Sequence, residues 1–278
     1  MLRGFYTAAA GMLSQERRVE MLTNNIANAN TPGYKADEAA LRAFPEMLLS
    51  RLEEAAIPVQ ERRSMMKKTP IGPISTGVYM QEMMPNFSQG DIKETNQPTD
   101  LALVNGVIPT DAATGKKGML FFVVQNENGA VRYTRNGNFT LDAQGYLTTN
   151  DGYYVLDENN TRIQLTSTNF TVAPDGTITG NNRRIARLNV AFAANPNAVA
   201  KEGNGLFRSE NGLLPSAIGN GNVTYEVKQR FLERSNVDVA RSMTDMMSAY
   251  RAFEANQKIL QAYDRSMDKA VNEIGRLK

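Results

Sequence analysis

The fold is decided by residues 239–274, which read VARSMTDMMSAYRAFEANQKILQAYDRSMDKAVNEI. Apolar side chains recur here at alternating steps of four and three, and nine of the eleven seam positions are apolar. This spacing is typical of a coiled-coil seam held over about five heptads. It predicts a helix about 54 Å long, at ~1.5 Å per residue. The seam positions are Val239, Met243, Met246, Tyr250, Phe253, Gln257, Leu260, Asp264, Met267, Val271 and Ile274.

A second helix is predicted at the start of the chain, over residues 1 to about 28. Its apolar stripe is weaker and comprises Leu2, Phe5, Ala9, Met12, Glu16, Val19, Thr23 and Ile26. A helix with one apolar stripe needs a partner surface. Because burial of one stripe does not outweigh the entropy of ordering so long a helix, we expect the terminal helices to order against neighbouring subunits. Pairing of the two helices within one chain is the alternative.

The first helix is expected to end near residues 28–30, in an asparagine-rich stretch that leads to Pro32 and Gly33. Asparagine is a poor helix former because its amide competes for backbone hydrogen bonds. Pro-Gly suits the middle of a type II turn, in which Gly33 takes a positive φ. The asparagine amides have two interpretations, a cap at the helix end or contacts that join neighbouring subunits.

The segments that follow change in character along the chain. Residues 37–56 have apolar side chains roughly on one face and predict a second helical piece, which Pro45 either kinks or divides by beginning a new helix. Residues 57–78 are rich in Pro, Gly, Ser and Thr and indicate a linker. The basic side chains in this linker are interpreted as part of a solvated loop. They are Arg62, Arg63, Lys67 and Lys68.

From about residue 79 the period becomes two, which favours strands. Strand candidates are 121–124 and 184–193. Residues 225–232 lead into the last helix, for which Ser235 or Asn236 is the candidate N-cap, with Asp238 in the first turn. Recurrent turn dipeptides predict short antiparallel hairpins in a meander. They are Asn128-Gly129, Asn136-Gly137, Gln144-Gly145, Asp151-Gly152 and Asp175-Gly176.

Together these patterns predict an α+β fold, in which long N- and C-terminal helices form a coiled-coil-like domain around an inserted, β-rich antiparallel central domain. Residues 1–35 and 236–278 form the terminal helical polymerisation domain. Residues 36–78 form a helical and linker segment, and residues 79–235 form the β-rich outer domain.

Composition excludes several classes of function. The chain has no Cys, His or Trp, so a disulfide, a thiolate metal site and a histidine-based triad are excluded. A net charge of +2 implies no nucleic-acid partner, and no run approaches the ~18 apolar residues of a membrane span. The N-terminus lacks the apolar core of a cleavable signal peptide, so export is expected to need no Sec signal.

Four carboxylates remain as candidates for acid–base or metal chemistry. They lie in or beside Gly and Asn turns, where Asp bonds its own backbone, so we expect no catalytic residue, no metal and no cofactor. They are Asp142, Asp151, Asp157 and Asp175.

Five segments carry a resemblance to bacterial flagellar rod and hook proteins, in that family's order. They are Tyr6 to Met12; Asn24-Asn25-Ile26-Ala27-Asn28 with Thr31 and Gly33-Tyr34-Lys35; Phe87-Ser88-Gln89-Gly90-Asp91 with Thr95, Pro98, Asp100 and Leu101; Tyr133 to Phe139 with Gly145-Tyr146-Leu147 and Asp151-Gly152; and Ser235-Asn236-Val237-Asp238 with Ala249 to Asn256. Length and the middle segment most resemble rod subunits of the FlgF, FlgG and FlhO type, and the pairing of 44–48 with 77–81 favours FlhO.

The resemblance implies a structural subunit that polymerises into the axial rod of the flagellar basal body. Its terminal helices would face inward, and its place would be outside the cytoplasmic membrane, crossing the cell wall. Implied partners are copies of itself, other rod and hook proteins, and the flagellar type III export apparatus, which passes the chain unfolded. A weak contact with peptidoglycan stays open. Alternatives are a hook or hook-junction subunit, a carbohydrate-binding wall module on a helical stalk, and a cytosolic coiled-coil protein.

Two sets of site residues follow. Phe44 and Leu48, four residues apart, form a candidate export signal of the kind that early exported subunits of the family carry, although any amphipathic helix has this spacing. The candidate assembly interface is Asn24, Asn25, Ile26, Asn28, Gly33, Tyr34, Val239, Met243, Met246, Tyr250, Phe253, Leu260 and Met267. Within this set, Gly33 is expected to serve backbone geometry.

Overall fold

A long helix stands at each end of the chain in the computed structural model, which describes residues 2–56, 64–112, 115–126, 128–165, 167 and 169–274. The N-terminal helix α1 covers Leu2–Ala27, close to the predicted end. The C-terminal helix α2 covers Val239–Lys269 and continues into a short π-helical segment, η2, at Ala270–Ile274. Both predicted terminal helices are therefore confirmed.

The chain forms two compact units, which are described separately. The helical unit contains residues 1–24, 37–84 and 240–278, and the strand unit contains residues 25–36 and 85–239. Each unit is assembled from segments that are far apart in the sequence.

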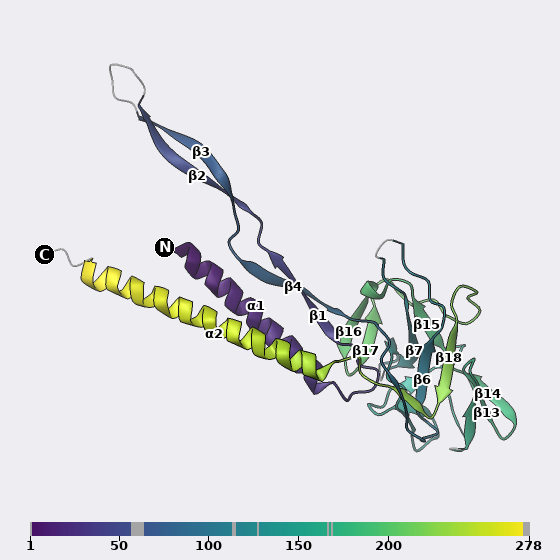
Figure 1. Ribbon diagram of the computed structural model, residues 1–278. Helices are drawn as coiled ribbons and strands as arrows, with labels where there is room; N and C mark the ends of the chain where they lie inside the picture. Colours follow the sequence, from purple (N-terminus) through teal and green to yellow (C-terminus); the bar gives the residue numbers. More distant parts are fainter. Residues whose placement is uncertain are drawn as a thin grey trace. The chain divides into compact units, whose positions relative to one another are not determined.

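In the helical unit, α1 and α2 run antiparallel (Figure 1). Two glycines of α1, seven residues apart, face large side chains of α2: a Cβ on Gly4 would overlap the Tyr263 hydroxyl, and one on Gly11 would lie 3.0 Å from Asn256 Nδ2. Further along, the Thr23 hydroxyl donates to Met246 Sδ at 3.6 Å. Because contact positions rise along α1 as they fall along α2, the helices pair over most of the length of α1.

The same unit contains two pairs of antiparallel strands. Strand β1 (Asp37–Ala43) pairs with β4 (Val78–Pro85), and β2 (Met47–Ala56) pairs with β3 (Ser64–Ile74). The prediction of a helix over 37–56 is therefore wrong, and so is that of a linker over residues 64–78, whereas residues 57–63 lie outside the described residues. The apolar periodicity was short and interrupted by Pro45, so long-range strand pairing overrode it. Of the four basic residues, Lys67 and Lys68 belong to β3, whereas Arg62 and Arg63 lie outside the described residues.

The strand unit is built around β7 (Met119–Gln125), whose first six residues are all buried. β7 pairs antiparallel with β8, β11 and β15. The order in this sheet is β16-β17-β8-β7-β11-β10-β9. Its other strands are β8 (Val131–Thr134), β9 (Phe139–Leu141), β10 (Leu147–Thr149), β11 (Tyr154–Val155), β15 (Val190–Ala193), β16 (Val199–Gly203) and β17 (Leu206–Ser209), and the 3-10 helix η1 (Pro196–Ala198) precedes β16.

Smaller sheets complete this unit. β12 (Phe170–Val172), β13 (Thr177–Gly180) and β14 (Arg183–Arg187) form one of them. Strand β6 (Leu101–Asn105) pairs with β18 (Tyr225–Gln229), and β5 (Ile92–Glu94) pairs with β19 (Phe231–Glu233). These last two pairs bring the start of the unit beside its end.

Alternate residues of β7 enter two separate apolar cores, as the period of a strand requires. Leu120, Phe122 and Val124 pack in the larger core, and Met119, Phe121 and Val123 pack in the smaller one. The predicted strand over 121–124 is therefore confirmed, and burial on both faces explains why it is continuously apolar.

The predicted hairpin turns are confirmed at four of five positions. Gly129, Gly145, Gly152 and Gly176 all have positive φ, between 79° and 86°. At Asn136-Gly137 no hairpin forms, because β8 pairs with β17 and β7 and not with β9. The predicted strand 184–193 is wrong as a single element, since it divides into β14 and β15 in different sheets.

The chain is thus α+β, with a helix at each end and many antiparallel strands between them. No helix in the described part of the chain combines the length and apolarity needed to cross a membrane.

Candidate functional site

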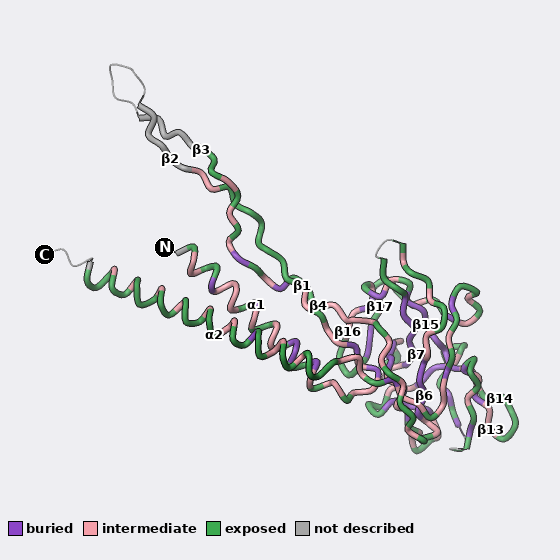
Figure 2. Tube along the Cα trace, viewed as in Figure 1, coloured by how far each residue is buried: buried purple, intermediate pink, exposed green. Residues whose placement is uncertain are grey.

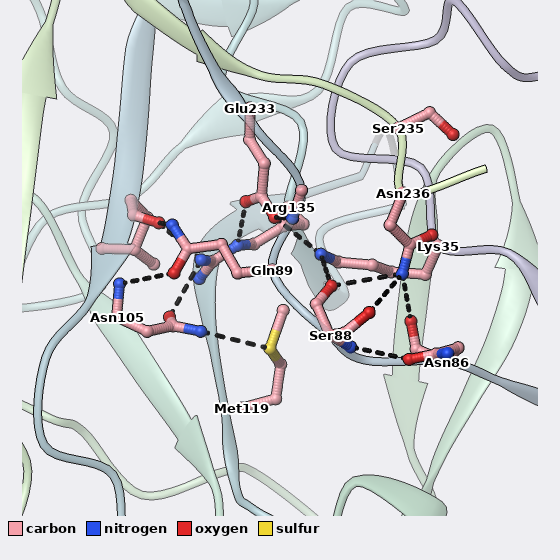
Figure 3. Close-up of polar contacts among 12 residues, drawn as sticks. Lys35, Asn86, Ser88, Gln89, Asn105, Met119, Arg135, Glu233, Ser235 and Asn236 are labelled. Atoms are coloured by element: carbon pink, nitrogen blue, oxygen red, sulfur yellow. Dashed lines mark hydrogen bonds and ion pairs between the residues drawn. The ribbon is translucent and has the colours of Figure 1, made fainter. Parts of the chain in front are cut away.

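Lys35, Arg135 and Glu233 form a buried charge cluster in the strand unit (Figure 3). Their exposed fractions are 0%, 1% and 2%. Lys35 follows the first turn of the chain, Arg135 follows β8, and Glu233 ends β19. At neutral pH the cluster places two cations against one carboxylate, so its net charge is positive.

The carboxylate of Glu233 holds the cluster together. Its Oε1 accepts from Lys35 Nζ at 2.6 Å and from the Gly90 amide at 2.9 Å, and its Oε2 accepts from Arg135 Nε at 2.5 Å. Burial alone would raise the pKa of Glu233, but the charges of Arg135 and Lys35 outweigh it and hold the pKa below its usual value.

The Arg135 guanidinium directs its remaining donors to β6 and β7. Nη1 donates to the Leu120 carbonyl at 2.8 Å, and Nη2 donates to the Leu103 carbonyl at 2.5 Å and to Asn105 Oδ1 at 2.9 Å. A buried charge is tolerated when its donors are satisfied. Arg135 therefore links Glu233 to β6 and β7.

Lys35 is bound on two sides. Besides Glu233, its Nζ donates to the Ser88 carbonyl at 2.7 Å. Burial lowers the pKa of the Lys35 ammonium group from 10.5 to about 8, although the Glu233 carboxylate opposes this shift. The ammonium group therefore stays mostly charged at pH 7.

A second layer of amide contacts lies beside the cluster. Asn236 Oδ1 accepts from the Ala36 amide at 2.8 Å, and its Nδ2 donates to the Asn86 carbonyl at 2.8 Å and to Ser88 Oγ at 3.0 Å. Neither Asn236 nor Ser235 directly precedes α2, so the prediction that one of them is its N-cap is wrong. Asp238 stands immediately before the helix and not in its first turn.

The turn at residues 31–34 confirms the prediction for Gly33. Gly33 has φ +69°, and the Tyr34 amide donates to the Thr31 carbonyl at 3.3 Å across the turn. The Gly33 amide donates to the Glu233 carbonyl at 2.8 Å. A Cβ here would lie 2.5 Å from the Arg135 carbonyl oxygen and 2.6 Å from the Asn136 nitrogen. Glycine therefore allows the first turn to lie against the segment after β8.

The predicted interface residues around this turn make contacts within the chain. Asn25 is buried and its Oδ1 accepts from the Tyr34 hydroxyl at 3.2 Å, while Asn28 Oδ1 accepts from Thr31 Oγ1 at 3.1 Å. Tyr34 also lies under the ammonium group of Lys201, whose Nζ is 4.3 Å from the ring centroid. Asn24 is exposed and Ile26 is half-buried. A role of these residues between subunits stays a prediction.

The predicted seam of α2 divides into two faces. Met246, Phe253, Leu260 and Met267, each seven residues from the next, are half-buried. The alternate positions are exposed. Figure 2 shows most of the length of α2 coloured as exposed. Those in the predicted interface are Met243 (53% exposed) and Tyr250 (55%), and Val239, seven residues before Met246, is also exposed (45%). One half of the seam is therefore open for a partner.

An apolar groove of about 740 Å³ opens within the helical unit. One wall is a face of α1 that includes Tyr6 and Leu13, and the other includes Phe44, Met47 and Val78. Phe44 is 37% exposed and packs on Tyr79, with 5.0 Å between ring centroids. Leu48 is 68% exposed. The two residues of the candidate export signal thus lie in and beside strands, not on one helix face.

Three of the four candidate carboxylates serve their own turns, as predicted. Asp142 Oδ1 accepts from the Gln144 and Tyr146 amides, Asp157 Oδ1 from Asn159 and Thr161, and Asp175 Oδ1 from Thr177. Among the described residues, no three carboxylate, imidazole or thiol side chains gather as they would around a metal ion.

Sequence reasoning missed the buried charge cluster. Lys35 and Arg135 lie within the segments that carry the resemblance, but neither has a periodicity that signals burial. Glu233 lies outside those segments, beside Phe231 and Leu232. Four of the resembling stretches meet around the Glu233 carboxylate; they are 33–35, 87–91, 133–139 and 235–238. Together they hold the first and last parts of the strand unit in contact.

Comparison with known proteins decides the family. Residues 5–35 match the family described as "Flagella basal body rod protein", 117–180 match "Flagellar hook protein FlgE/F/G D1 domain", and 228–273 match "Flagellar basal body rod FlgEFG protein C-terminal". The chain is 49% identical to "Flagellar hook-basal body complex protein FlhO" of Bacillus subtilis (strain 168), with all of both chains covered.

The chain belongs to the flagellar rod and hook protein family. Its members are structural proteins of the flagellum, not enzymes. The chain is also 30% identical to "Flagellar basal-body rod protein FlgG" of Agrobacterium fabrum, over 95% of this chain and 96% of the relative. It is 28% identical to "Flagellar basal-body rod protein FlgF" of Caulobacter vibrioides, with both chains fully covered. The resemblance drawn from the five segments is thus confirmed.

The pKa values in the cluster predict how stability depends on pH. Folded Lys35 has a lower pKa than the unfolded lysine, so between about pH 8 and 10 the unfolded chain binds more protons and stability rises with pH. Folded Glu233 also has a lowered pKa, so its contribution is present above the usual pKa of 4.5 and is lost as pH falls below that value. Urea midpoints measured by tyrosine fluorescence from pH 3 to 10 test both directions.

The control for this prediction is a Lys35→Met variant, in which the rise between pH 8 and 10 should disappear. A wild-type midpoint that is flat or falling over that range would contradict the assignment.

Proposed function

We propose that this chain is a subunit of the flagellar basal-body rod, and that it polymerises into the axial drive shaft through its terminal helices. The observation that carries the proposal is the likeness to the hook-basal body protein FlhO over the whole length of both chains. Relatives at 28–30% identity named as rod proteins FlgG and FlgF favour the rod over the hook. A hook or hook-junction subunit of the same family is the second candidate.

The proposed polymerisation domain consists of residues 1–35 and 236–278, with a coiled-coil-like bundle formed between copies, and residues 79–235 form the inserted outer domain. The exposed half of the α2 seam supports this assignment, because an apolar face on a helix that is already paired remains available for a neighbour. The candidate interface residues near the first turn would contribute to assembly by fixing where α1 ends. They are Asn24, Asn25, Ile26, Asn28, Gly33 and Tyr34.

An in-frame deletion tests the proposal. In the bacterium that carries this gene, loss of the protein is expected to abolish swimming and to remove hooks and filaments, because a rod must be complete before they are added. Electron microscopy of isolated basal bodies is the measurement. Normal hooks and filaments would contradict a rod position.

Complementation of the deletion with variant genes tests whether the exposed apolar face of α2 is needed, and not only the presence of the protein. The wild-type gene should restore swimming, whereas Met243→Glu should not, because the change puts a charge on the exposed apolar face. The matched control is Arg241→Glu, a charge change at a residue whose side chain is 83% exposed in its ion pair with Asp245. An equal loss of swimming with both variants would argue against a role of the exposed apolar face of α2 in assembly.

We propose that the chain leaves the cytoplasm through the flagellar type III apparatus, and that Phe44 with Leu48 is part of the signal. The support is their spacing and their position early in the chain. Phe44→Ala is expected to lower secretion about tenfold or more, the effect of losing roughly 1.4 kcal/mol of recognition. Immunoblots of cell and culture fractions give the measurement.

The control for export is Ile71→Ala, a loss of another exposed apolar side chain on β3 (62% exposed). If Phe44→Ala is secreted as well as Ile71→Ala, Phe44 is not part of the export signal. We also propose that the exported chain lies in the basal body, outside the cytoplasmic membrane and crossing the cell wall. A contact with peptidoglycan is a further proposal, which wall-binding assays would test.

A further inference from the structure

The groove in the helical unit has the geometry of a binding groove for an amphipathic helix. The residues that α1 contributes to its lining include Arg3, Tyr6, Ala10, Leu13 and Arg17, which follow one another at steps of three and four. Tyr6 is 64% exposed and Leu13 is 56% exposed. Seam spacing on one helix is the pattern that receives a second helix.

A matching stripe stands on α2. Val239, Met243, Met247 and Tyr250 follow at steps of four, four and three, and they are between 45% and 55% exposed. This is the i, i+4, i+7 type of anchor that an amphipathic helix presents to a groove. On the same face the stripe is followed by the exposed Glu254. We call these four apolar residues the outward stripe.

The groove and the outward stripe remain open after α1 and α2 have paired. The pairing uses Gly4 and Gly11 of α1 against Tyr263 and Asn256 of α2, and none of these four residues belongs to the groove or to the stripe. One chain therefore carries two different apolar faces that its own helix pair leaves uncovered.

Charge and length make the two faces complementary. Arg3 and Arg17 lie at the ends of the apolar lining, about 21 Å apart along α1, and no carboxylate occurs among the described residues that line the groove. The outward stripe spans about 17 Å along α2 and fits between the two arginines. Glu254, one turn beyond Tyr250, then comes near one of the guanidinium groups.

Two different faces on one chain form a heterologous contact, which does not close on itself and builds an open helical array. We propose that the outward stripe of α2 from a second copy of this chain docks in the groove formed by α1 and the strands of the helical unit. This inference rests on the proposed function, since it names the contact by which copies of the rod subunit would join.

Cysteine cross-linking tests the docking, because the chain has no native cysteine. A variant with Leu13→Cys and Met247→Cys places one thiol in the groove and one on the stripe. Oxidation of isolated basal bodies and of the concentrated purified full chain should give disulfide-linked dimers and longer ladders. The matched control combines Leu13→Cys with Ser248→Cys, an exposed position about 100° further round α2. We expect the first pair to cross-link about tenfold more, because docking raises the local concentration of its thiols.

A charge variant adds an independent measurement. In the Leu13→Cys, Met247→Cys background, Arg3→Glu together with Arg17→Glu should lower the yield of dimers, because Glu254 would then meet like charges. An unchanged yield would overturn the docking geometry.

The outcomes separate the two proposals. If the wild-type chain is present in basal bodies but the Met247→Cys pair cross-links no better than the Ser248→Cys pair, the docking is overturned and the rod assignment stands. If the wild-type chain is absent from basal bodies, the rod assignment fails and the docking fails with it. A preferred Met247→Cys ladder in both preparations supports the docking.

Discussion

Replacing Glu233 by glutamine is expected to destabilise the strand unit by about 3–5 kcal/mol, because the change leaves two buried cations without their counter-charge. Lys35 and Arg135 each bond this carboxylate and are at most 1% exposed. A glutamine amide has a single acceptor oxygen in place of the two carboxylate oxygens, so at least one cation would lose its partner. The free energy of unfolding, from urea titration followed by tyrosine fluorescence, gives the measurement.

The matched control is Glu158→Gln, which removes the partner of Arg184 in an exposed ion pair with an Nη2–Oε1 distance of 2.7 Å. Exposed pairs of this kind contribute about 0–1 kcal/mol. If the two variants lose the same stability, the buried charge cluster is not a main support of the strand unit.

Gly33→Ala is expected to cost the strand unit about 2–5 kcal/mol, as the sum of two effects. A non-glycine residue in the left-handed region costs roughly 1–2 kcal/mol. In addition, its Cβ would lie 2.5 Å from the Arg135 carbonyl oxygen, and overpacking of this kind costs about 1–3 kcal/mol. The turn cannot move away freely, because the Gly33 amide bonds the Glu233 carbonyl.

Gly152→Ala is the control that carries the backbone cost without the steric effect. Gly152 has φ +86°, but nothing lies within 4 Å of the position that a Cβ would take. It should therefore cost only the roughly 1–2 kcal/mol of the left-handed conformation. Equal losses for Gly33→Ala and Gly152→Ala, measured by urea unfolding, would show that the close approach at Arg135 relaxes easily.

The parts of the fold that local chemistry controls could be predicted from the sequence. Long apolar periodicity located α1 and α2, and a run of large apolar residues located β7. The end of α1 and the turn at Gly33 followed from the asparagines and Pro-Gly, since their backbone preferences act within a few residues.

The parts that long-range pairing controls could not be predicted in this way. Residues 37–56 have apolar spacings that suit a helix, yet β1 pairs with β4 about forty residues later, and no local signal announces that partner. The buried charge cluster was missed for the same reason, because Lys35, Arg135 and Glu233 approach one another only through the fold. The α2 seam is different, because both of its polar positions, Gln257 and Asp264, fall on the exposed face, so the sequence carries a local signal for that division.

The position of the buried charge cluster has a mechanical consequence for a structural protein of the flagellum. The segment at residues 33–36 and the segment at residues 233–236 flank the bulk of the strand unit, and they bond each other directly. A pull on the chain at these two segments would therefore be borne where they meet, by ionic and amide contacts around a buried carboxylate. Arg135 would pass part of this load to β6 and β7 through the Leu103 and Leu120 carbonyls, while strands farther from the cluster would keep their shape.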